Sequence, residues 1–207
     1  MKIHDVEQNT PEWHAARAGI PTASCFDKIC TPTGKASTQA EGYANLLIAE
    51  WMTGGQVETW AGNQWSERGH ELEADAAAYY EMVKQVKLEK IGFVTDDAGT
   101  MGASPDRKIE GLNRLVEIKC PSPAVHISYL LNNKIDQGYN SQLQGQLLVT
   151  GFDGVDIISY CPGLPSIIIP NERDPIYLGT MRRMIDNFNE MLAEKKARII
   201  ELGYKEA

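Results

Sequence analysis

The chain has 207 residues, of which 43% are hydrophobic and 23% are charged, a composition typical of a globular protein with a sizeable core. Acidic residues number 28 and basic residues 20, so the formal net charge is −8. This balance excludes a protein that coats DNA without specificity, because such affinity comes from neutralising phosphates with basic side chains. It does not exclude an enzyme that holds nucleic acid in one local basic groove.

Two further patterns predict where the protein resides. No run of about 18 apolar residues exists, which excludes a membrane span, and the N-terminus lacks the apolar run of a signal peptide. The cysteines are scattered, with no C-x-x-C pair and no histidine spaced to complete a zinc site. These residues are Cys25, Cys30, Cys120 and Cys161. We therefore expect reduced thiols in a cytoplasmic protein that makes no contact with a membrane.

The first part of the chain is predicted to be helical. Pro11 lies where a helix would begin and Gly19 where it would end, which are the usual positions of these two residue types. Further along, Y-A-N-L-L-I-A-E-W-M has apolar residues at helical spacing and is followed by two glycines. The predicted helices span residues 11–19, 22–29, 40–53 and 63–83.

The hydrophobic period then changes, and strands become the expected elements. Segments 87–94 and 100–103 should pair across a D-D-A-G turn at residues 96–99. The remaining predictions are a strand pair at 106–109 and 115–119, helices at 124–131 and 135–149, strands at 155–160 and 166–169, and a closing helix at 176–202. This order predicts an α/β fold of the mixed α+β kind, a central mixed sheet flanked by helices. No polar linker divides the chain, so residues 1–207 are expected to form a single domain.

The chemistry is concentrated between Gly102 and Pro121. Asp106 begins one predicted strand, and Glu117 and Lys119 lie two apart on the next, so their side chains leave the same face. In a hairpin the two carboxylates converge, and they would repel each other without a cation. Oxygen ligands favour Mg²⁺ or Mn²⁺, and such an ion beside a lysine suits phosphodiester hydrolysis. An ordinary charged surface hairpin is the alternative at this point.

These residues resemble the two motifs of the PD-(D/E)XK nuclease superfamily, here S-P-D at residues 104–106 and E-I-K at 117–119. The resemblance implies a restriction-endonuclease-like fold. It also implies that Mg²⁺, with Mn²⁺ able to substitute, is bound by Asp106, Glu117 and the main-chain carbonyl of Ile118. Lys119 would orient the attacking water or stabilise negative charge in the transition state.

Two helical segments extend the resemblance. R-G-H-E-L-E-A-D-A, residues 68–76, is similar to the acidic helix motif of the superfamily, which implies that Glu73 approaches the metal as a third carboxylate. Y-N-S-Q-L-Q-G-Q, residues 139–146, is similar to the Q-x-Q helix that follows the lysine strand. This similarity implies that Gln144 acts near the attacking water and that Gln142 contacts the substrate further out. The alternative for both segments is a polar helix surface.

The N-terminal segment narrows the family. W-H-A-A-R-A-G-I-P-T-A-S, residues 13–24, resembles the opening of the bacteriophage lambda exonuclease type of viral recombinase. This resemblance implies that Arg17 and Ser24 bind the terminal 5′ phosphate of DNA, a role that suits a guanidinium fork and a hydroxyl at a helix start. Lys35, in a T-G-K loop, is a further phosphate candidate by position, with a solvated lysine as the alternative.

The combined resemblance implies a Mg²⁺-dependent 5′-to-3′ exonuclease. It would degrade one strand of linear double-stranded DNA to mononucleotides, leave a 3′ overhang and use Asp106, Glu117, Lys119 and Gln144 in catalysis. The family also implies a ring-shaped homotrimer and a partnership with a single-strand annealing protein in the bacterial cytoplasm. Two alternatives stay open: a structure- or sequence-specific endonuclease of the same fold, and a catalytically silent module that binds DNA ends.

Overall fold

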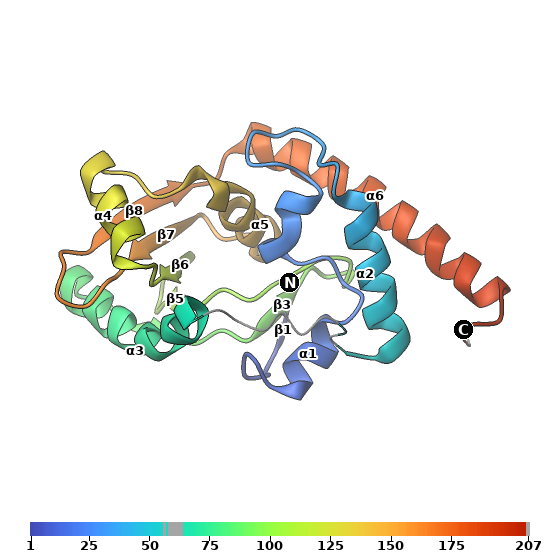
Figure 1. Ribbon diagram of the computed structural model, residues 1–207, viewed down its shortest axis with the longest axis horizontal. Coiled ribbons are helices and arrows are strands. Elements are labelled where there is room, and N and C mark those ends of the chain that lie inside the picture. The colour runs from blue at the N-terminus through green and yellow to red at the C-terminus, as the bar shows by residue number, and fades with distance from the viewer. Residues whose placement is uncertain (56, 58–63, 206–207) are drawn as a thin grey trace.

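The computed structural model describes residues 1–55, 57 and 64–205, and its N-terminal part is helical as expected (Figure 1). The first helix is capped by Thr10, whose side chain accepts a hydrogen bond from the backbone N–H of Trp13. Gly54, with a φ of 72°, ends the helix predicted at residues 40–53 and has the left-handed conformation that favours glycine. The elements are α1 (Pro11–Arg17), the 3₁₀ helix η1 (Ala23–Lys28), α2 (Ala40–Thr53) and α3 (Gln64–Lys84). The predicted start of α3 at residue 63 lies outside the described residues.

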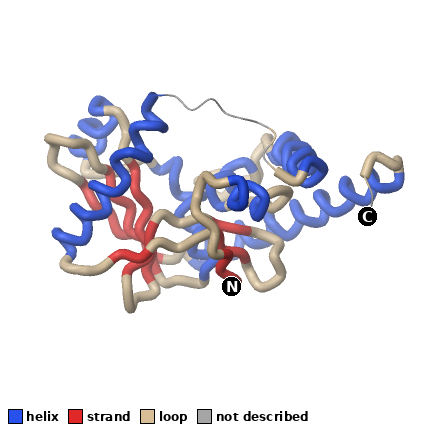
Figure 2. The backbone as a smooth tube through the Cα atoms, turned by 90° about the horizontal axis from the view of Figure 1, so that it is seen from below, coloured by secondary structure: helices blue, strands red, loops and turns tan. Residues whose placement is uncertain are grey.

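The predicted mixed sheet is confirmed as five strands in the order β2-β5-β6-β7-β8. The pair β6 and β7 is parallel, and the other neighbouring pairs are antiparallel. The strands are β2 (Leu88–Glu89), β5 (Arg107–Ile109), β6 (Arg114–Lys119), β7 (Gly154–Ser159) and β8 (Ile167–Glu172). Figure 2 shows these strands lying between helices.

The prediction of one continuous strand at 87–94 is wrong. Its first part is β2 of the large sheet, whereas its end belongs to β3 (Phe93–Thr95) of a second sheet with β1 (Lys2–His4) and β4 (Gly102–Ala103). Gly92 lies at the break, where a Cβ atom would approach the carbonyl oxygen of His4 to 2.2 Å. Glycine therefore allows the N-terminal strand to cross closely at this point. The predicted pairing of segments 87–94 and 100–103 across the D-D-A-G turn is confirmed only at its end, where Val94 pairs with Ala103, and Thr95 with Gly102.

Helices cover both faces of the large sheet. On one face, α3 packs Ala76 and Tyr80 against Val116 and Ile118 of β6. On the other face, Leu143 and Leu147 of α5 (Asn140–Thr150) pack with alternate strand residues such as Leu115. Because alternate residues of a strand face opposite ways, Glu117 and Lys119 point to the α5 side together with Leu115. The helix α4 (Pro123–Asn132) follows β6 directly.

One helix is shorter than predicted. Residues 135–149 were expected to form a single helix, but α5 begins at Asn140, after the 3₁₀ turn η2 (Gln137–Tyr139). The Asp136 side chain accepts a hydrogen bond from the N–H of Gly138, which holds the chain in a turn before the helix starts.

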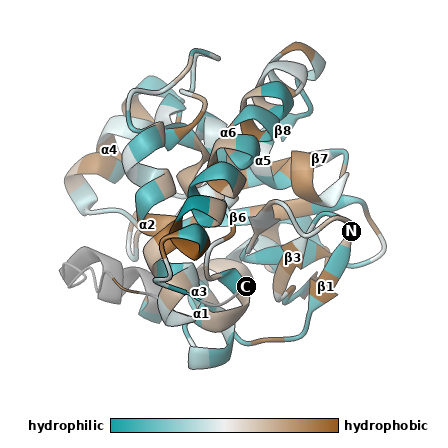
Figure 3. Ribbon diagram, turned by 90° about the vertical axis from the view of Figure 1, so that its right-hand side faces the viewer, coloured by the Kyte–Doolittle hydropathy of each residue, from teal (hydrophilic) through white to brown (hydrophobic). Residues whose placement is uncertain are grey.

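The closing helix α6 (Pro175–Glu201) packs on α2 and extends beyond the body of the molecule (Figure 1). Its buried side includes Met181, Ile185, Phe188 and Leu192, at helical spacing. Figure 3 shows hydrophilic and hydrophobic residues along the same helix, as expected when one side is buried. Among the described residues, no helix has the length and apolar character needed to span a bilayer.

Candidate active site

The hairpin of β5 and β6 brings the two predicted carboxylates together. Arg107 is paired with Val116, so the residue before the first strand, Asp106, lies opposite Glu117 when the register is continued. Oδ2 of Asp106 accepts a hydrogen bond of 2.7 Å from the backbone N–H of Ile118. This bond ties the Asp106 side chain to the strand that carries Glu117.

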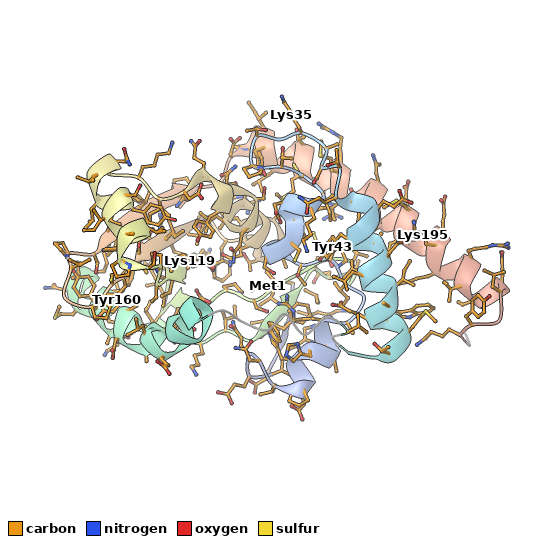
Figure 4. The ribbon with its side chains drawn as sticks, in the orientation of Figure 1. Met1, Lys35, Tyr43, Lys119, Tyr160 and Lys195 are labelled. Carbon is orange, nitrogen blue, oxygen red and sulfur yellow. The ribbon has the colours of Figure 1, made fainter. Side chains whose placement is uncertain are left out.

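Lys119 lies beside the carboxylates. Its Nζ is 2.7 Å from Oε1 of Glu117 and 3.3 Å from Oε1 of Gln142, and it lies 4.8 Å from the centre of the Tyr139 ring. Figure 4 shows Lys119 between α3 and α4, in the interior of the view. Burial lowers the pKa of Lys119, but the carboxylates of Glu117 and Asp106 outweigh it and hold this pKa above its ordinary value. The side chain is therefore a cation at neutral pH.

Asp106 occupies an unfavourable place for a negative charge. Burial and the nearby Glu117 carboxylate raise the pKa of Asp106 well above its usual range, although Lys119 and the N–H of Ile118 oppose the effect. Two neighbouring carboxyl groups, Asp106 and Glu117, are thus accompanied by one lysine, Lys119. Such a site favours a bound cation.

The glutamines of α5 correct one prediction. Nε2 of Gln142 donates to Oε1 of Glu117 at 2.6 Å, and Nε2 of Gln146 donates to Oε2 at 2.7 Å. Gln144 points away from them: its amide donates to the carbonyl of Glu172 and accepts from the N–H of Asp174. Gln142 and Gln146 are four residues apart and share one helix face, whereas Gln144 lies on the other. That spacing is the signal that identifies Gln146, which the sequence analysis did not select.

Glu73 is close to the carboxylate pair but has another partner. It forms an ion pair with Arg107, whose Nη1 also donates to the main-chain carbonyl of Asp106. Glu73 and Asp106 line the same cavity, which has a volume of about 440 Å³. Within the described residues, no three side chains of His, Cys, Asp or Glu are grouped closely enough to hold a metal. The structure thus does not bring Glu73 into one ligand group with Asp106 and Glu117.

A second polar cluster surrounds Arg17. Nη1 of Arg17 donates to Oγ of Ser104 at 3.1 Å, and Nη2 lies 3.2 Å from Oγ1 of Thr22 and 3.5 Å from Oγ of Ser24. The guanidinium stacks over the Trp13 ring at 4.0 Å from its centre. Burial of the guanidinium lowers the pKa of Arg17, because partial removal from water disfavours the charged form. A desolvated guanidinium among hydroxyl groups suits an anion.

The predicted pair of Arg17 and Ser24 is therefore brought together, whereas Lys35 is not. Lys35 is exposed on a turn, where its backbone N–H donates to Oγ1 of Thr31. Figure 4 shows Lys35 at the upper edge of the molecule, far from Lys119. Ser24 of the Arg17 cluster also lines a recess of about 270 Å³ together with Tyr139 and Gln142, two residues that contact Lys119.

Comparisons with known proteins identify the family of this chain. Residues 12–153 match the model of the YqaJ-like viral recombinase domain. The crystal structure of an alkaline exonuclease from Laribacter hongkongensis is similar over 96% of this chain and 100% of its own, with 30% identity and a TM-score of 0.84. The same enzyme in complex with dAMP gives 30% identity and a TM-score of 0.83 over the same shares.

A phage-related exonuclease from Haemophilus somnus 129PT shares the fold, with 14% identity and a TM-score of 0.68 over 88% of this chain and 96% of its own. A comparison with curated protein sequences gives no match. The family model covers well over half of the chain, from before the Arg17 cluster to beyond the glutamine helix. The chain therefore belongs to the YqaJ-like viral recombinase family, a nuclease family of the lambda exonuclease type.

Proposed function

We propose that this nuclease is a Mg²⁺-dependent exonuclease that digests one strand of linear double-stranded DNA from a 5′-phosphorylated end. It would release mononucleotides and leave a 3′ single-stranded overhang. The observation that carries the proposal is the meeting of Asp106, Glu117 and Lys119 on one hairpin. Ser24 of the Arg17 cluster lines a recess with Gln142, which contacts both Lys119 and Glu117.

The residues present fit a hard divalent cation. The donors are carboxylate oxygens, with the carbonyl of Ile118 on the same strand as Glu117. Burial and the Glu117 carboxylate both disfavour the charge of Asp106, and a bound cation would offset both effects. Mg²⁺ usually takes one or two carboxylates and completes its shell with water and substrate phosphate, so Asp106 and Glu117 suffice without Glu73. When bound, the ion would lower the pKa of a water ligand and neutralise charge on the phosphate.

Lys119 would serve as a charged donor. The carboxylates of Glu117 and Asp106 hold its pKa above the ordinary value, so the ammonium is protonated and would hold a water molecule or stabilise negative charge. Gln142 holds both Lys119 and Glu117 through its amide and therefore fixes the distance between them. These contacts keep the cation and the carboxylate in place before the substrate arrives.

The Arg17 cluster would bind the terminal phosphate. Arg17 offers two nitrogens in a fork, and the hydroxyls of Thr22, Ser24 and Ser104 lie within 3.5 Å of them. Such donors match the oxygens of a phosphate dianion. A mononucleotide, dAMP, is bound in one structure of the similar exonuclease, which supports release of single nucleotides.

The family also supports a proposal about the domain organisation, the oligomeric state and the partner protein of this nuclease. We propose that residues 1–207 act as a single domain, assemble as a homotrimer around DNA and cooperate with a single-strand annealing protein in the cytoplasm. A net charge of −8 is consistent with DNA threading if basic groups line the channel and acidic groups face outward. Light scattering of the purified protein measures the oligomeric state directly, and a monomeric mass would contradict the ring.

The test of the reaction uses one linear duplex labelled at its 5′ ends and one covalently closed circle, each with Mg²⁺ or with EDTA. We expect labelled mononucleotide from the linear duplex with Mg²⁺ only, and an intact circle. Cleavage of the circle would favour the endonuclease alternative. No digestion of either DNA with Mg²⁺ or Mn²⁺ would favour the silent module.

A further inference from the structure

The Glu117 carboxylate is held on both of its oxygens. The residue is 2% exposed. Oε1 accepts hydrogen bonds from Lys119 and Gln142, at 2.7 and 2.6 Å. Oε2 accepts one from Gln146, at 2.7 Å. Among the hydrogen bonds of the described residues, Gln146 is the donor that fixes the second oxygen.

The Gln146 side chain is buried at a cost. It is 1% exposed, and no donor within the described part of the chain reaches its Oε1. A buried amide oxygen without a partner is unfavourable, and an apolar residue of similar size, such as methionine, would avoid that cost. Packing therefore does not explain a glutamine here, whereas the bond from its Nε2 to Glu117 does.

We propose that Gln146 is a positioning residue, which sets the Glu117 carboxylate in the orientation that binds the catalytic divalent cation. The bonds from Lys119 and Gln142 both act on Oε1 and leave the carboxylate able to turn about that end. The bond from Gln146 stops this rotation, and it also stabilises the charged form of the acid. The inference rests on the proposed function, since it presumes that Glu117 is a metal ligand.

Gln144 provides a matched comparison on the same helix. It is a glutamine of the same size and is 3% exposed, and it makes two hydrogen bonds, to the carbonyl of Glu172 and the N–H of Asp174. Its removal should lower stability without changing Glu117. If a substitution of Gln146 weakens metal binding and the same substitution of Gln144 does not, the cause is the orientation of the Glu117 carboxylate and not a general loosening of α5.

The experiment measures Mn²⁺ binding to the full chain without DNA, by isothermal titration calorimetry and by the electron paramagnetic resonance signal of free Mn²⁺. Partners that orient a metal ligand typically contribute about 10- to 100-fold to affinity, so we expect Gln146→Met to weaken Mn²⁺ binding by about 10-fold or more. Gln144→Met should bind Mn²⁺ as the unmodified protein does. If Gln146→Met does not fold by circular dichroism, Gln146→Asn, which is one methylene shorter, replaces it with Gln144→Asn as its control.

The outcomes separate the two levels of the proposal. If the unmodified protein binds no Mn²⁺, the metal site itself is wrong, and the role of Gln146 is overturned with it. If the unmodified protein binds Mn²⁺ and the Gln146 variant binds equally well, the metal site stands and the positioning role is overturned. Equal weakening by the Gln144 and Gln146 variants would also overturn it, because the effect would then belong to the helix.

Discussion

Arg17 donates a hydrogen bond of 3.1 Å to the hydroxyl of Ser104, although 87 residues separate them in the chain. Ser104 lies two residues before Asp106 and also accepts a hydrogen bond from the indole of Trp13. The group proposed to hold the DNA end is thus bonded to the segment that carries a proposed metal ligand. Under the proposed function, this contact would hold the terminal phosphate at a fixed distance from the metal site.

Arg17→Ala should impair digestion of 5′-phosphorylated ends much more than digestion of 5′-hydroxyl ends. A charged hydrogen bond contributes about 1.5–3 kcal/mol, which corresponds to roughly a 10- to 100-fold loss of rate at limiting DNA. Initial rates on the two duplexes measure the ratio. An equal loss on both ends would contradict the phosphate pocket.

Lys119→Ala should reduce digestion of linear duplex by about 100-fold or more, because a preorganised charged donor is lost where negative charge develops. Binding to DNA ends, measured by fluorescence anisotropy with Ca²⁺, should remain. Lys108→Ala is the control, since Lys108 lies on the same hairpin and pairs with Glu89 instead of the site. Unchanged digestion by the Lys119 variant would refute the assignment of this residue.

Tyr139 supports Lys119 through its ring. Nζ of Lys119 lies 4.8 Å from the centre of that ring, a cation–π distance worth about 0.5–2 kcal/mol. Tyr139→Phe keeps the ring and should digest DNA at nearly the normal rate, whereas Tyr139→Leu should be slower by about 2- to 30-fold. The two variants are compared by single-turnover kinetics, and equal rates would show that the ring has no part.

Tyr80 should contribute to stability and not to the reaction. Its hydroxyl donates to Oδ2 of buried Asp156 at 2.6 Å, and Arg114 holds the other oxygen at 2.7 Å. Tyr80→Phe leaves one carboxylate oxygen short of a donor and should lower the free energy of unfolding by about 1–3 kcal/mol. Urea denaturation measures this loss. Tyr79→Phe, at a residue that packs its ring on Tyr160, is the control, and equal losses for both variants would contradict the interpretation.

The sequence was sufficient for the parts of the site that are local. Asp106, Glu117 and Lys119 could be placed together because a short hairpin fixes its own register, and alternation along a strand then decides which side chains share a face. A central mixed sheet flanked by helices followed from the order of helices and strands, although its division into a five-stranded and a three-stranded sheet did not.

The parts that depend on how distant elements pack could not be predicted. Gln144 and Gln142 are the glutamines that the sequence motif indicates, and Gln146 is not, because the sequence shows which residues lie on α5 but not how the helix is rotated against β6. Glu73 was expected at the metal, but the partner that holds it, Arg107, becomes visible only when α3 is placed on the sheet. The break between β2 and β3 at Gly92 could not be predicted either, because it depends on the close approach of the N-terminal strand β1.

Asp106→Asn should stabilise the protein without metal while it removes the reaction. Burial and Glu117 raise the pKa of Asp106 in the folded chain, so its charged form opposes folding at neutral pH. The resulting loss in the free energy of unfolding is absent below about pH 4, the ordinary pKa of an aspartate. It grows as the pH rises from there toward the raised pKa of Asp106 in the folded chain. Asparagine keeps an oxygen for the N–H of Ile118 but carries no charge.

Thermal unfolding at pH 7.5 in EDTA and in Mg²⁺ tests this prediction. In EDTA the variant should have a higher Tm than the unmodified protein. With Mg²⁺ the unmodified protein should gain stability because the ion binds the folded state, and the variant should gain little. A variant that is less stable in EDTA, or that responds to Mg²⁺ as strongly as the unmodified protein, would show that charge at Asp106 neither opposes folding nor attracts the metal.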